Sequence, residues 1–203
     1  TTLKACMGII TITEGDILLN GISVVKEPIV CKRKMAYVPD TPRLEEYMTG
    51  MQYLNFVCDI YQISAKERKQ NIERLIHAFQ MEPHISGLIS SYSHGMKQKV
   101  ALIAAFSHNP KLLVLDEPFV GLDPEAFIAL KEQMKMLCRK GSSILFSSHI
   151  LDVVEKLCNI ISIIKDGRLL YSGLTEELIG VEGLEDAFME LNSNESFDPS
   201  IEK

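Results

Sequence analysis

The sequence lacks the features that would place the chain across a membrane or on a nucleic acid. No apolar run approaches the roughly 20 residues that a membrane-spanning helix needs, and the best stretch, Val100 to Phe106, is far shorter. Any link to a membrane must therefore come through a partner. The 21 lysines and arginines are outnumbered by 27 aspartates and glutamates, and this acidic balance supplies no basic field for a polyanion. We therefore expect no nucleic acid as the main partner.

Cysteine is present but lacks the spacing of a disulfide framework or a zinc site. The five cysteines are odd in number and scattered, and none lies in a CxxC pattern. They are typical of small core residues in a reducing cytoplasm. With 46% hydrophobic and 24% charged residues over 203 positions, the chain can form one globular domain, or one domain with a small subdomain.

Short apolar segments that alternate with helical ones predict an α/β fold with a mostly parallel sheet. The expected strands are 15–21, which turn residues bound, and 35–39, 111–116 and 143–147. The third of these is apolar between its charged ends, as in a strand buried on both faces. A helix is predicted from Asp123, as N-cap, through Pro124 to about Arg139, and another from about Ile150.

From about residue 45 to residue 107 the apolar spacing turns helical, which predicts a helical subdomain inserted into the α/β core. Within it, Ser64 and Glu67 form a capping-box pattern that opens a charged amphipathic helix through Phe79. Near the C-terminus we expect the following elements: a hairpin of strands 160–164 and 168–171 around a turn at 165–167, a short helix near 185–191, and a polar, acidic, disordered tail at 192–203.

Two adjacent carboxylates close the strand predicted at 111–116. Asp116 and Glu117 come at its carboxyl end, the edge where open α/β sheets bind ligands. The first could hold Mg²⁺ through its waters, and the second, which points the other way, could orient an attacking water. Taken alone, a strand that ends in Asp-Glu-Pro could equally be an acidic turn.

Ser93 and Gly95 lie just before the apolar helix segment Val100 to Phe106. A serine hydroxyl and a glycine at a helix N-terminus expose backbone N–H groups at the positive end of the helix dipole. That arrangement makes an anion site suited to a terminal phosphate. The alternative is an ordinary serine N-cap.

Two further candidates flank the acidic strand. His149 follows the strand predicted at 143–147, so it should reach the same sheet edge as Asp116, where it could donate to a γ-phosphate oxygen. A lone histidine at a strand end is more often a solvated cap. Asp123 is an N-cap in any interpretation, so a functional role would be additional to capping.

Taken together, these segments resemble the motifs of ATP-binding cassette (ABC) ATPases, in the family's order. Tyr92–Met96 resembles the ABC signature, Leu115–Pro118 resembles the Walker B strand, and Gly121–Asp123 resembles the D-loop. Ser148–His149 resembles the H-loop, and Ala36–Asp40 resembles the segment leading to the Q-loop, with Asp40 in place of glutamine. Thr1–Gly8 resembles the helix that follows a Walker A GK[ST]. The matches extend over the chain up to its tail. Each is modest alone, and their combination is specific.

The resemblance implies a fold, ligands and site residues. It implies a P-loop NTPase-like core, with an ABC ATP-binding domain over residues 1–191 that includes the helical subdomain at about 45–107, followed by the tail at 192–203. It implies ATP and Mg²⁺ as cofactors, with Asp116 and Asp40 toward the metal. The expected catalytic residues are Glu117, His149 and Asp116, and the expected nucleotide-binding residues are Thr1, Thr2, Asp40, Ser93, Gly95 and Asp123.

The resemblance also implies partners. ABC cassettes form a head-to-tail dimer in which the signature of one subunit closes the nucleotide site of the other, so we expect a second ATP-binding subunit, identical or not. A transmembrane permease subunit is the other expected partner, on the cytoplasmic, inner face of the cell membrane. His94 and Met96, where glycine and glutamine are commoner, resemble the signature of single-cassette subunits of ABC-2-type exporters.

The phosphate-binding loop of the family is missing from the sequence. None of the twelve glycines is followed by lysine, so GxxxxGK[ST] does not occur. Because the chain starts inside what resembles the helix after that loop, we expect it to lack an N-terminal piece with the loop and a central strand. Without that loop the chain should bind ATP feebly.

Two other hypotheses stay open. One is a non-catalytic regulatory or interaction module that has lost nucleotide binding, although such a module has no chemical reason to retain Asp116, Glu117 and His149 together. The other is a soluble ABC ATPase that acts on ribosomes or in DNA repair. For that class we would expect tandem cassettes, a coiled-coil insertion or basic arms, and the sequence has none of these.

Overall fold

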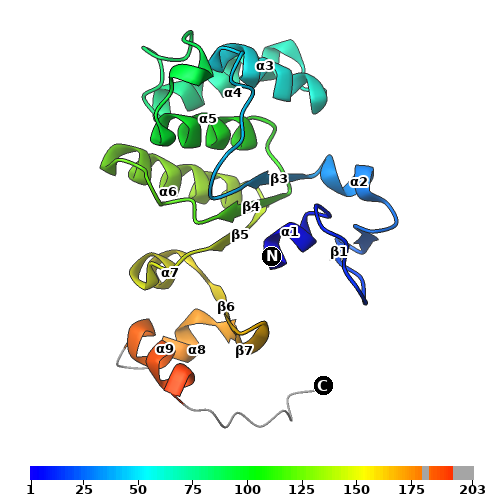
Figure 1. Cartoon of the computed structure of the whole chain (residues 1–203), viewed down its shortest axis with the longest axis vertical. Coiled ribbons are helices and arrows are strands. Elements are labelled where there is room, and N and C mark those ends of the chain that lie inside the picture. The colour runs from blue at the N-terminus through cyan, green and yellow to red at the C-terminus, as the bar shows by residue number, and fades with distance from the viewer. Residues whose placement is uncertain (180–182, 194–203) are drawn as a thin grey trace. The chain divides into compact units, whose positions relative to one another are not determined.

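The computed structural model describes residues 1–179 and 183–193, with side chains through residue 189. Its contacts divide the chain into two compact units (Figure 1). The first unit runs from Thr1 to Ser147, and the second begins at Ser148. No helix in the described part of the chain is long and apolar enough to cross a membrane.

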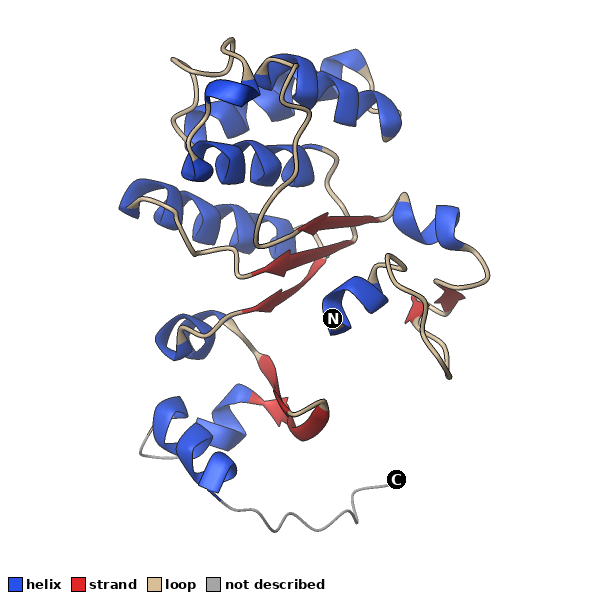
Figure 2. Ribbon diagram, viewed as in Figure 1, coloured by secondary structure: helices blue, strands red, loops and turns tan. Residues whose placement is uncertain are grey.

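A parallel three-stranded sheet forms the centre of the first unit (Figure 2). Its strands lie in the order β3 (Met35–Val38), β4 (Leu112–Asp116) and β5 (Ser143–Ser147). The predicted strands 35–39, 111–116 and 143–147 are confirmed to within one residue, as is the α/β fold. Parallel neighbours need long crossovers, and helices supply them in both connections.

The two faces of β4 are buried against different elements. Helices α5 (His94–Ser107) and α6 (Pro124–Arg139) contact each other and lie on one side of the sheet (Figure 1). On the other face, a buried cluster joins the strands to the N-terminal elements. Its members are Met7, Val24, Cys31, Met35 and Val114. The predicted burial of β4 on both faces is confirmed, because Leu113, Val114 and Leu115 are completely buried.

The N-terminal elements are short. They are α1 (Thr2–Cys6), β1 (Leu18–Leu19), β2 (Ile22–Ser23) and α2 (Pro28–Lys32). The prediction of a single strand over 15–21 is wrong in extent, because Asn20 and Gly21 adopt φ values of 50° and 79° and reverse the chain. β1 then pairs with β2 in an antiparallel hairpin. Asn-Gly with both φ values positive is the turn that two-residue hairpins favour.

The predicted helical subdomain forms as expected between β3 and β4. It contains α3 (Gly50–Ile60), α4 (Ala65–Ala78), a 3₁₀ turn at Ile89–Ser91 and the helix α5. Ser64 accepts the N–H of Glu67 and caps α4 as predicted, and Phe79 is the C-cap. The reciprocal capping box is in α3 instead, where Thr49 and Gln52 bond each other's backbone N–H.

In its described residues, the second unit contains the predicted hairpin and three helices. After α7 (Leu151–Leu157), strands β6 (Ile160–Lys165) and β7 (Arg168–Leu174) pair antiparallel. Asp166 and Gly167 form the turn with φ values of 51° and 77°. The other helices are α8 (Thr175–Ile179) and α9 (Leu184–Ser193). The predicted tail at 192–203 begins within α9, and residues 194–203 lie outside the described residues.

Gly50 fixes the start of α3 against a neighbouring loop. Its N–H donates to the carbonyl of Gly87 at 3.2 Å, and the next N–H donates to the carbonyl of Ile85 at 2.9 Å. A Cβ added at Gly50 would lie 2.6 Å from the hydroxyl oxygen of Tyr92 and 3.0 Å from the Ile85 carbonyl oxygen. Because that hydroxyl itself donates to the His84 carbonyl at 2.7 Å, it cannot retreat without losing a bond.

Gly50→Ala should therefore destabilise the chain. Alanine in a helix normally gains up to about 1 kcal/mol over glycine, but overpacking costs about 1–3 kcal/mol, and a backbone neighbour cannot yield as a flexible side chain can. We expect a net loss of roughly 1–2 kcal/mol in the free energy of urea unfolding. Gln70→Ala on the exposed face of α4 is the control. A gain for Gly50→Ala would contradict the tight packing.

Candidate functional site

Asp116 is held at the carboxyl end of β4 by two hydroxyl groups from the neighbouring strands. Ser147 Oγ donates to Asp116 Oδ1 at 2.6 Å, and the Tyr37 hydroxyl donates to Oδ2 at 3.3 Å. The register explains both contacts. Asp116 lies opposite Ser147 of β5. Tyr37 of β3 lies opposite Val114, which is two residues before Asp116 on β4. All of these side chains fall on the same face of the sheet.

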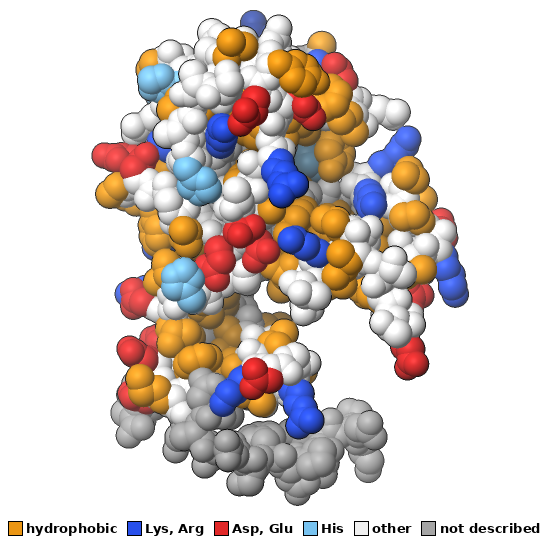
Figure 3. Space-filling view, in the orientation of Figure 1, with side chains coloured by type: hydrophobic (Ala, Val, Ile, Leu, Met, Phe, Trp, Pro, Cys, Tyr) orange, Lys and Arg blue, Asp and Glu red, His pale blue; other side chains and the backbone are white. Residues whose placement is uncertain are grey.

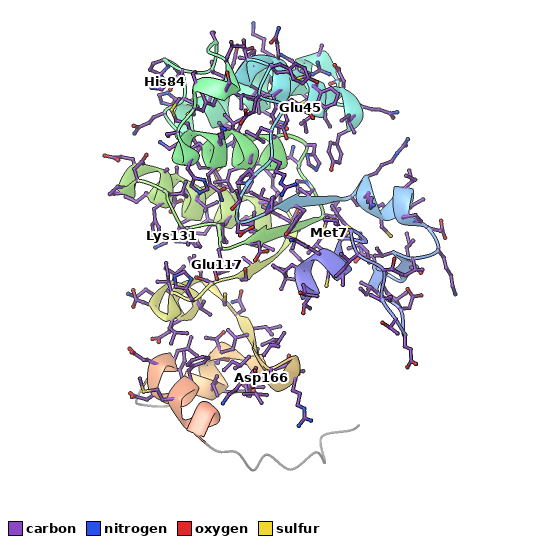
Figure 4. All side chains as sticks on the ribbon, viewed as in Figure 1. Met7, Glu45, His84, Glu117, Lys131 and Asp166 are labelled. Atoms are coloured by element: carbon purple, nitrogen blue, oxygen red, sulfur yellow. The ribbon has the colours of Figure 1, made fainter. Side chains whose placement is uncertain are left out.

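Glu117 follows with a backbone conformation that non-glycine residues rarely adopt. Its φ is 47°, and its N–H donates to Ser147 Oγ at 3.0 Å while its carbonyl accepts from Val120 at 3.2 Å. A left-handed conformation costs an L-residue about 1–2 kcal/mol, and such strain persists where surrounding bonds fix it, often at functional sites. Figure 4 places Glu117 just beyond the end of β4.

Tyr37 is the site residue that the sequence analysis missed. Burial, together with the charge of Asp116 and the bond to it, raises the pKa of Tyr37 to about 12. The phenol therefore stays protonated and donates to the carboxylate at physiological pH. A tyrosine inside the predicted strand 35–39 was the only signal in the sequence, and its partner lies 79 positions away.

The oxygens near this edge fit part of a magnesium site. Mg²⁺ is usually held by one or two carboxylates together with waters and substrate phosphates. Asp116 has two oriented carboxylate oxygens that can each accept a further contact. Asp40 is exposed and close enough to add to the raised pKa of Tyr37. The described residues contain no group of three or more ligating side chains, so phosphate and water would have to complete the coordination.

The N-terminus of α5 has the form expected of an anion site. Ser93 is exposed and is the N-cap, because its Oγ accepts the N–H of Met96 at 3.2 Å. Gly95 lies in the first turn of this 14-residue helix, where the dipole and the backbone N–H groups favour negative charge. The expectation of a serine cap is thus confirmed, and the phosphate contact stays a prediction.

Asp123 caps α6 as predicted. Its Oδ1 accepts the N–H of Ala126 at 2.8 Å, and its Oδ2 lies 2.6 Å from Lys99 Nζ. The bond from Lys99, followed by that from Ala126, lowers the pKa of Asp123. The predicted D-loop turn therefore connects the carboxylate edge of the sheet to helices α5 and α6.

A cleft of about 890 Å³ opens beside β3 and the helical subdomain. Its lining combines charged groups from α1 and the segment after β3 with aromatic rings of the helices. These residues include Lys4, Asp40, Arg43, Tyr53, Tyr61 and His108. The Tyr61 and His108 rings stack with centroids 3.6 Å apart. The face shown in Figure 3 carries acidic side chains near its middle, with lysine and arginine side chains beside them.

The remaining candidates are Thr1, Thr2 and His149. Thr1 and Thr2 are exposed at the start of α1. His149 is exposed in the second unit, next to Ser148, whose Oγ accepts the N–H of Ile150 at 3.1 Å. The role predicted for His149 beside Asp116 and Glu117 therefore stays a prediction.

Known proteins have sequences similar to this one. A protein-family model described as ABC transporter matches residues 1–120. Over 190 residues the chain is 34% identical to the ABC-type transporter ATP-binding protein EcsA of Bacillus subtilis (strain 168), an alignment that covers 94% of this chain and 77% of that protein. Over 182 residues it is 35% identical to the uncharacterized ABC transporter ATP-binding protein all4389 of Nostoc sp. (strain PCC 7120 / SAG 25.82 / UTEX 2576), with coverage of 89% and 54%.

The fold is shared as well. A solved structure described as the ATP binding subunit of an ABC transporter superposes with a TM-score of 0.90 at 34% sequence identity, over 94% of this chain and 82% of that one. Because the family model covers more than half of the chain and the relatives match most of it, the chain belongs to the ABC transporter family as an ATP-binding subunit with a P-loop NTPase-like fold.

Proposed function

We propose that this subunit binds and hydrolyses ATP in a head-to-tail dimer and thereby powers transport by membrane subunits. The observation that carries the proposal is the hydroxyl network at the end of β4, in which Ser147 and Tyr37 orient Asp116 and Ser147 also fixes the backbone of Glu117. An ordinary acidic turn has no need of a carboxylate that two hydroxyl groups orient. The arrangement suits a reaction that needs both a metal-facing carboxylate and a base.

Each residue has a chemical role in this reaction. Glu117 orients a water and takes its proton as the water oxygen attacks the γ-phosphorus and the bond to the ADP oxygen breaks. Asp116 and Asp40 face the metal, and Mg²⁺ would neutralise charge on the phosphate oxygens when bound. His149 donates to a γ-phosphate oxygen, and Asp123, Thr1 and Thr2 contribute contacts to the nucleotide.

The nucleotide pocket requires a phosphate-binding loop in addition to these residues. The N–H cradle and lysine of such a loop neutralise the β- and γ-phosphates, and the 203 residues contain no GxxxxGK[ST]. Sheet geometry favours a strand next to β5: Leu145 is 42% exposed, and β5 is the last strand of its sheet among the described residues. We infer that a strand leading to the loop pairs there.

Two partners follow from the proposal. Ser93 and Gly95 of one subunit would close the nucleotide pocket of the other, so that ATP binding joins the cassettes and hydrolysis releases them. The cleft lined by Asp40, Tyr61 and His108 would receive the membrane subunit, because it lies between the sheet edge and the helical subdomain. This arrangement puts the subunit on the inner face of the cell membrane.

Export is the proposed direction of transport. It rests on the signature, in which His94 and Met96 resemble ABC-2-type exporter subunits. The second candidate function is a module without nucleotide binding, and the observation that favours it is the absent GxxxxGK[ST] pattern. The first experiment below distinguishes the two.

The 203-residue chain should have negligible ATPase activity, and an extended chain should recover it. By extended chain we mean these residues preceded by a segment that carries a strand and a GxxxxGK[ST] loop. The loop supplies the phosphate cradle that the hydrolytic carboxylates need. Steady-state phosphate release from both proteins tests this. Equal turnover without the loop would contradict the assigned mechanism, and no turnover in either would favour the non-catalytic module.

In the extended chain, Glu117→Gln should block hydrolysis while ATP still binds. The amide keeps the shape of the side chain but cannot accept a proton, and loss of a positioned base costs about 10²- to 10⁴-fold in rate. An ATP-bound dimer should accumulate in size-exclusion chromatography. His149→Ala should lower turnover by about 10²- to 10³-fold. If Glu117→Gln stays monomeric with ATP, the composite dimer is wrong.

A mixed dimer of the 203-residue chain with an extended copy should have one working pocket. That pocket combines the P-loop, carboxylates and histidine of the extended copy with Ser93 and Gly95 of the shorter chain. Ser93→Arg in the shorter chain should abolish turnover, because the bulky side chain obstructs the anion site. Glu117→Gln in the same chain should change it little, since no P-loop holds phosphate beside it. ATPase assays of purified mixed dimers, in which the two chains carry different tags, test this. If Glu117→Gln abolishes turnover and Ser93→Arg does not, the head-to-tail assignment is wrong.

A further inference from the structure

The two edges of the parallel sheet differ in charge. Asp40, Asp116 and Glu117 lie at or just after the carboxyl ends of β3 and β4. The segments that lead into the three strands contain no aspartate or glutamate. They are residues 28–39, 83–115 and 133–147. Because the strands are parallel, their amino ends meet at one edge, and Figure 2 shows β3, β4 and β5 pointing away from α2.

Exposed cations gather at this amino edge. We call them the basic edge, and they are Arg33, Lys34, Lys111, Arg139 and Lys140. Backbone hydrogen bonds bring their segments together, because the Lys111 N–H donates to the Lys34 carbonyl at 2.7 Å and the Ser143 N–H donates to the Lys111 carbonyl at 2.9 Å. Lys140 Nζ donates to Asn109 Oδ1 at 3.4 Å. Three segments that lie far apart in the sequence therefore form one positively charged surface.

The basic edge is not neutralised within the described part of the chain. None of its side chains forms an ion pair with a carboxylate of the described residues. Lys97 and Lys99, by contrast, pair with Glu46 and Asp123. Like charges held side by side repel one another and destabilise the compact state. In a chain with a formal net charge of −6, a basic surface without its own acidic partners indicates that an anionic partner supplies the counter-charge.

Apolar side chains are exposed beside these cations. Ile29 and Val30 of α2 are 66% and 39% exposed, and they precede Arg33 and Lys34 by one helical turn. Surfaces that combine exposed apolar side chains with lysine and arginine are typical of binding to anionic bilayers, where the apolar groups enter the headgroup region. Phosphate contacts dominate nucleic-acid binding and need no aliphatic side chains. The combination therefore favours a lipid surface over a nucleic acid.

The basic edge is continuous with the cleft proposed for the membrane subunit. His108 lines that cleft and lies three residues before Lys111. Its Nε2 is 3.4 Å from the carbonyl oxygen of Met35, the residue after Lys34. A membrane subunit bound in the cleft would therefore bring the basic edge toward the same bilayer.

We propose that the basic edge and α2 bind the headgroups of anionic phospholipids directly at the membrane surface. This contact goes beyond the proposed function, in which the chain reaches the membrane through a subunit. Several headgroup phosphates pair with the cations at once, and Ile29 and Val30 enter between the headgroups. Each lysine or arginine near an anionic surface strengthens binding about 5-fold. The attraction falls off within a Debye length, so it weakens as salt is added.

Co-sedimentation of the 203-residue chain with vesicles tests the proposal without ATP or a partner subunit. The chain should bind mixed vesicles of phosphatidylcholine and phosphatidylglycerol, and it should bind vesicles of phosphatidylcholine alone far more weakly. Lys34→Gln combined with Lys111→Gln should lower the partition coefficient about 25-fold, because two cations are removed. Ile29→Ser should lower it about 3- to 10-fold at unchanged charge, because an apolar contact is lost.

The matched control is Lys66→Gln combined with Lys69→Gln, which removes the same charge from exposed positions of α4. It should leave the partition coefficient unchanged. Circular dichroism checks that the variants are folded, as expected for Lys34 and Lys111, whose hydrogen bonds at this edge are made by the backbone.

Several outcomes would overturn the proposal. Equal binding to both kinds of vesicle, or an equal loss in the two double variants, would contradict recognition of anionic lipid by the basic edge. Stronger binding to polyuridylic RNA than to the anionic vesicles would identify a nucleic acid as the partner instead. Sodium phosphate should displace the chain no better than sodium chloride of equal ionic strength, and preferential displacement would indicate a site for free phosphate. Unchanged binding of Ile29→Ser would contradict the apolar contact. Failure in these assays leaves the proposed ATPase function standing, since phosphate release from the extended chain tests that function separately.

Discussion

The candidate site depends on two hydrogen bonds of the Ser147 hydroxyl group. It donates to Asp116 and accepts the N–H of Glu117, so one group orients a side chain and fixes the backbone of the next residue. The contact exists because β4 and β5 pair with Asp116 opposite Ser147. A register shift of one residue would move every side chain to the other face of the sheet. The completely buried middle of β4 resists such a shift, and packing far from the edge thereby sets the geometry of the site.

The same edge links segments that lie apart in the sequence. The strained backbone of Glu117 starts a turn that contacts α5 twice. Gly121 of this turn packs against the first turn of α5, and Asp123 forms an ion pair with Lys99. The strain is maintained because bonds on both sides of Glu117 oppose its release.

Much of the fold could be predicted because helix caps and turns depend on residues within a few positions. Asp123 before Pro124 set the start of α6, and the apolar run before Asp116 set β4. The errors were local as well. Turn residues were expected to bound the strand over 15–21, but the hairpin that Asn20 and Gly21 form was not predicted, and neither was α8. Thr49 and Gln52 have the spacing of a capping box, but the sequence analysis recognised that pattern only at Ser64 and Glu67.

The sequence by itself determined the family, the order of the main strands and helices, and the identities of Asp116, Glu117, Ser93 and Asp123 as candidates, because motif order and capping patterns lie along the chain. Only the tertiary structure decided that Tyr37 donates to Asp116, that Gly95 contacts Gly121 and that Lys99 pairs with Asp123. These contacts depend on strand register and on how helices pack against the sheet. Register and packing are fixed by the burial of the whole core, which no single segment of the sequence encodes.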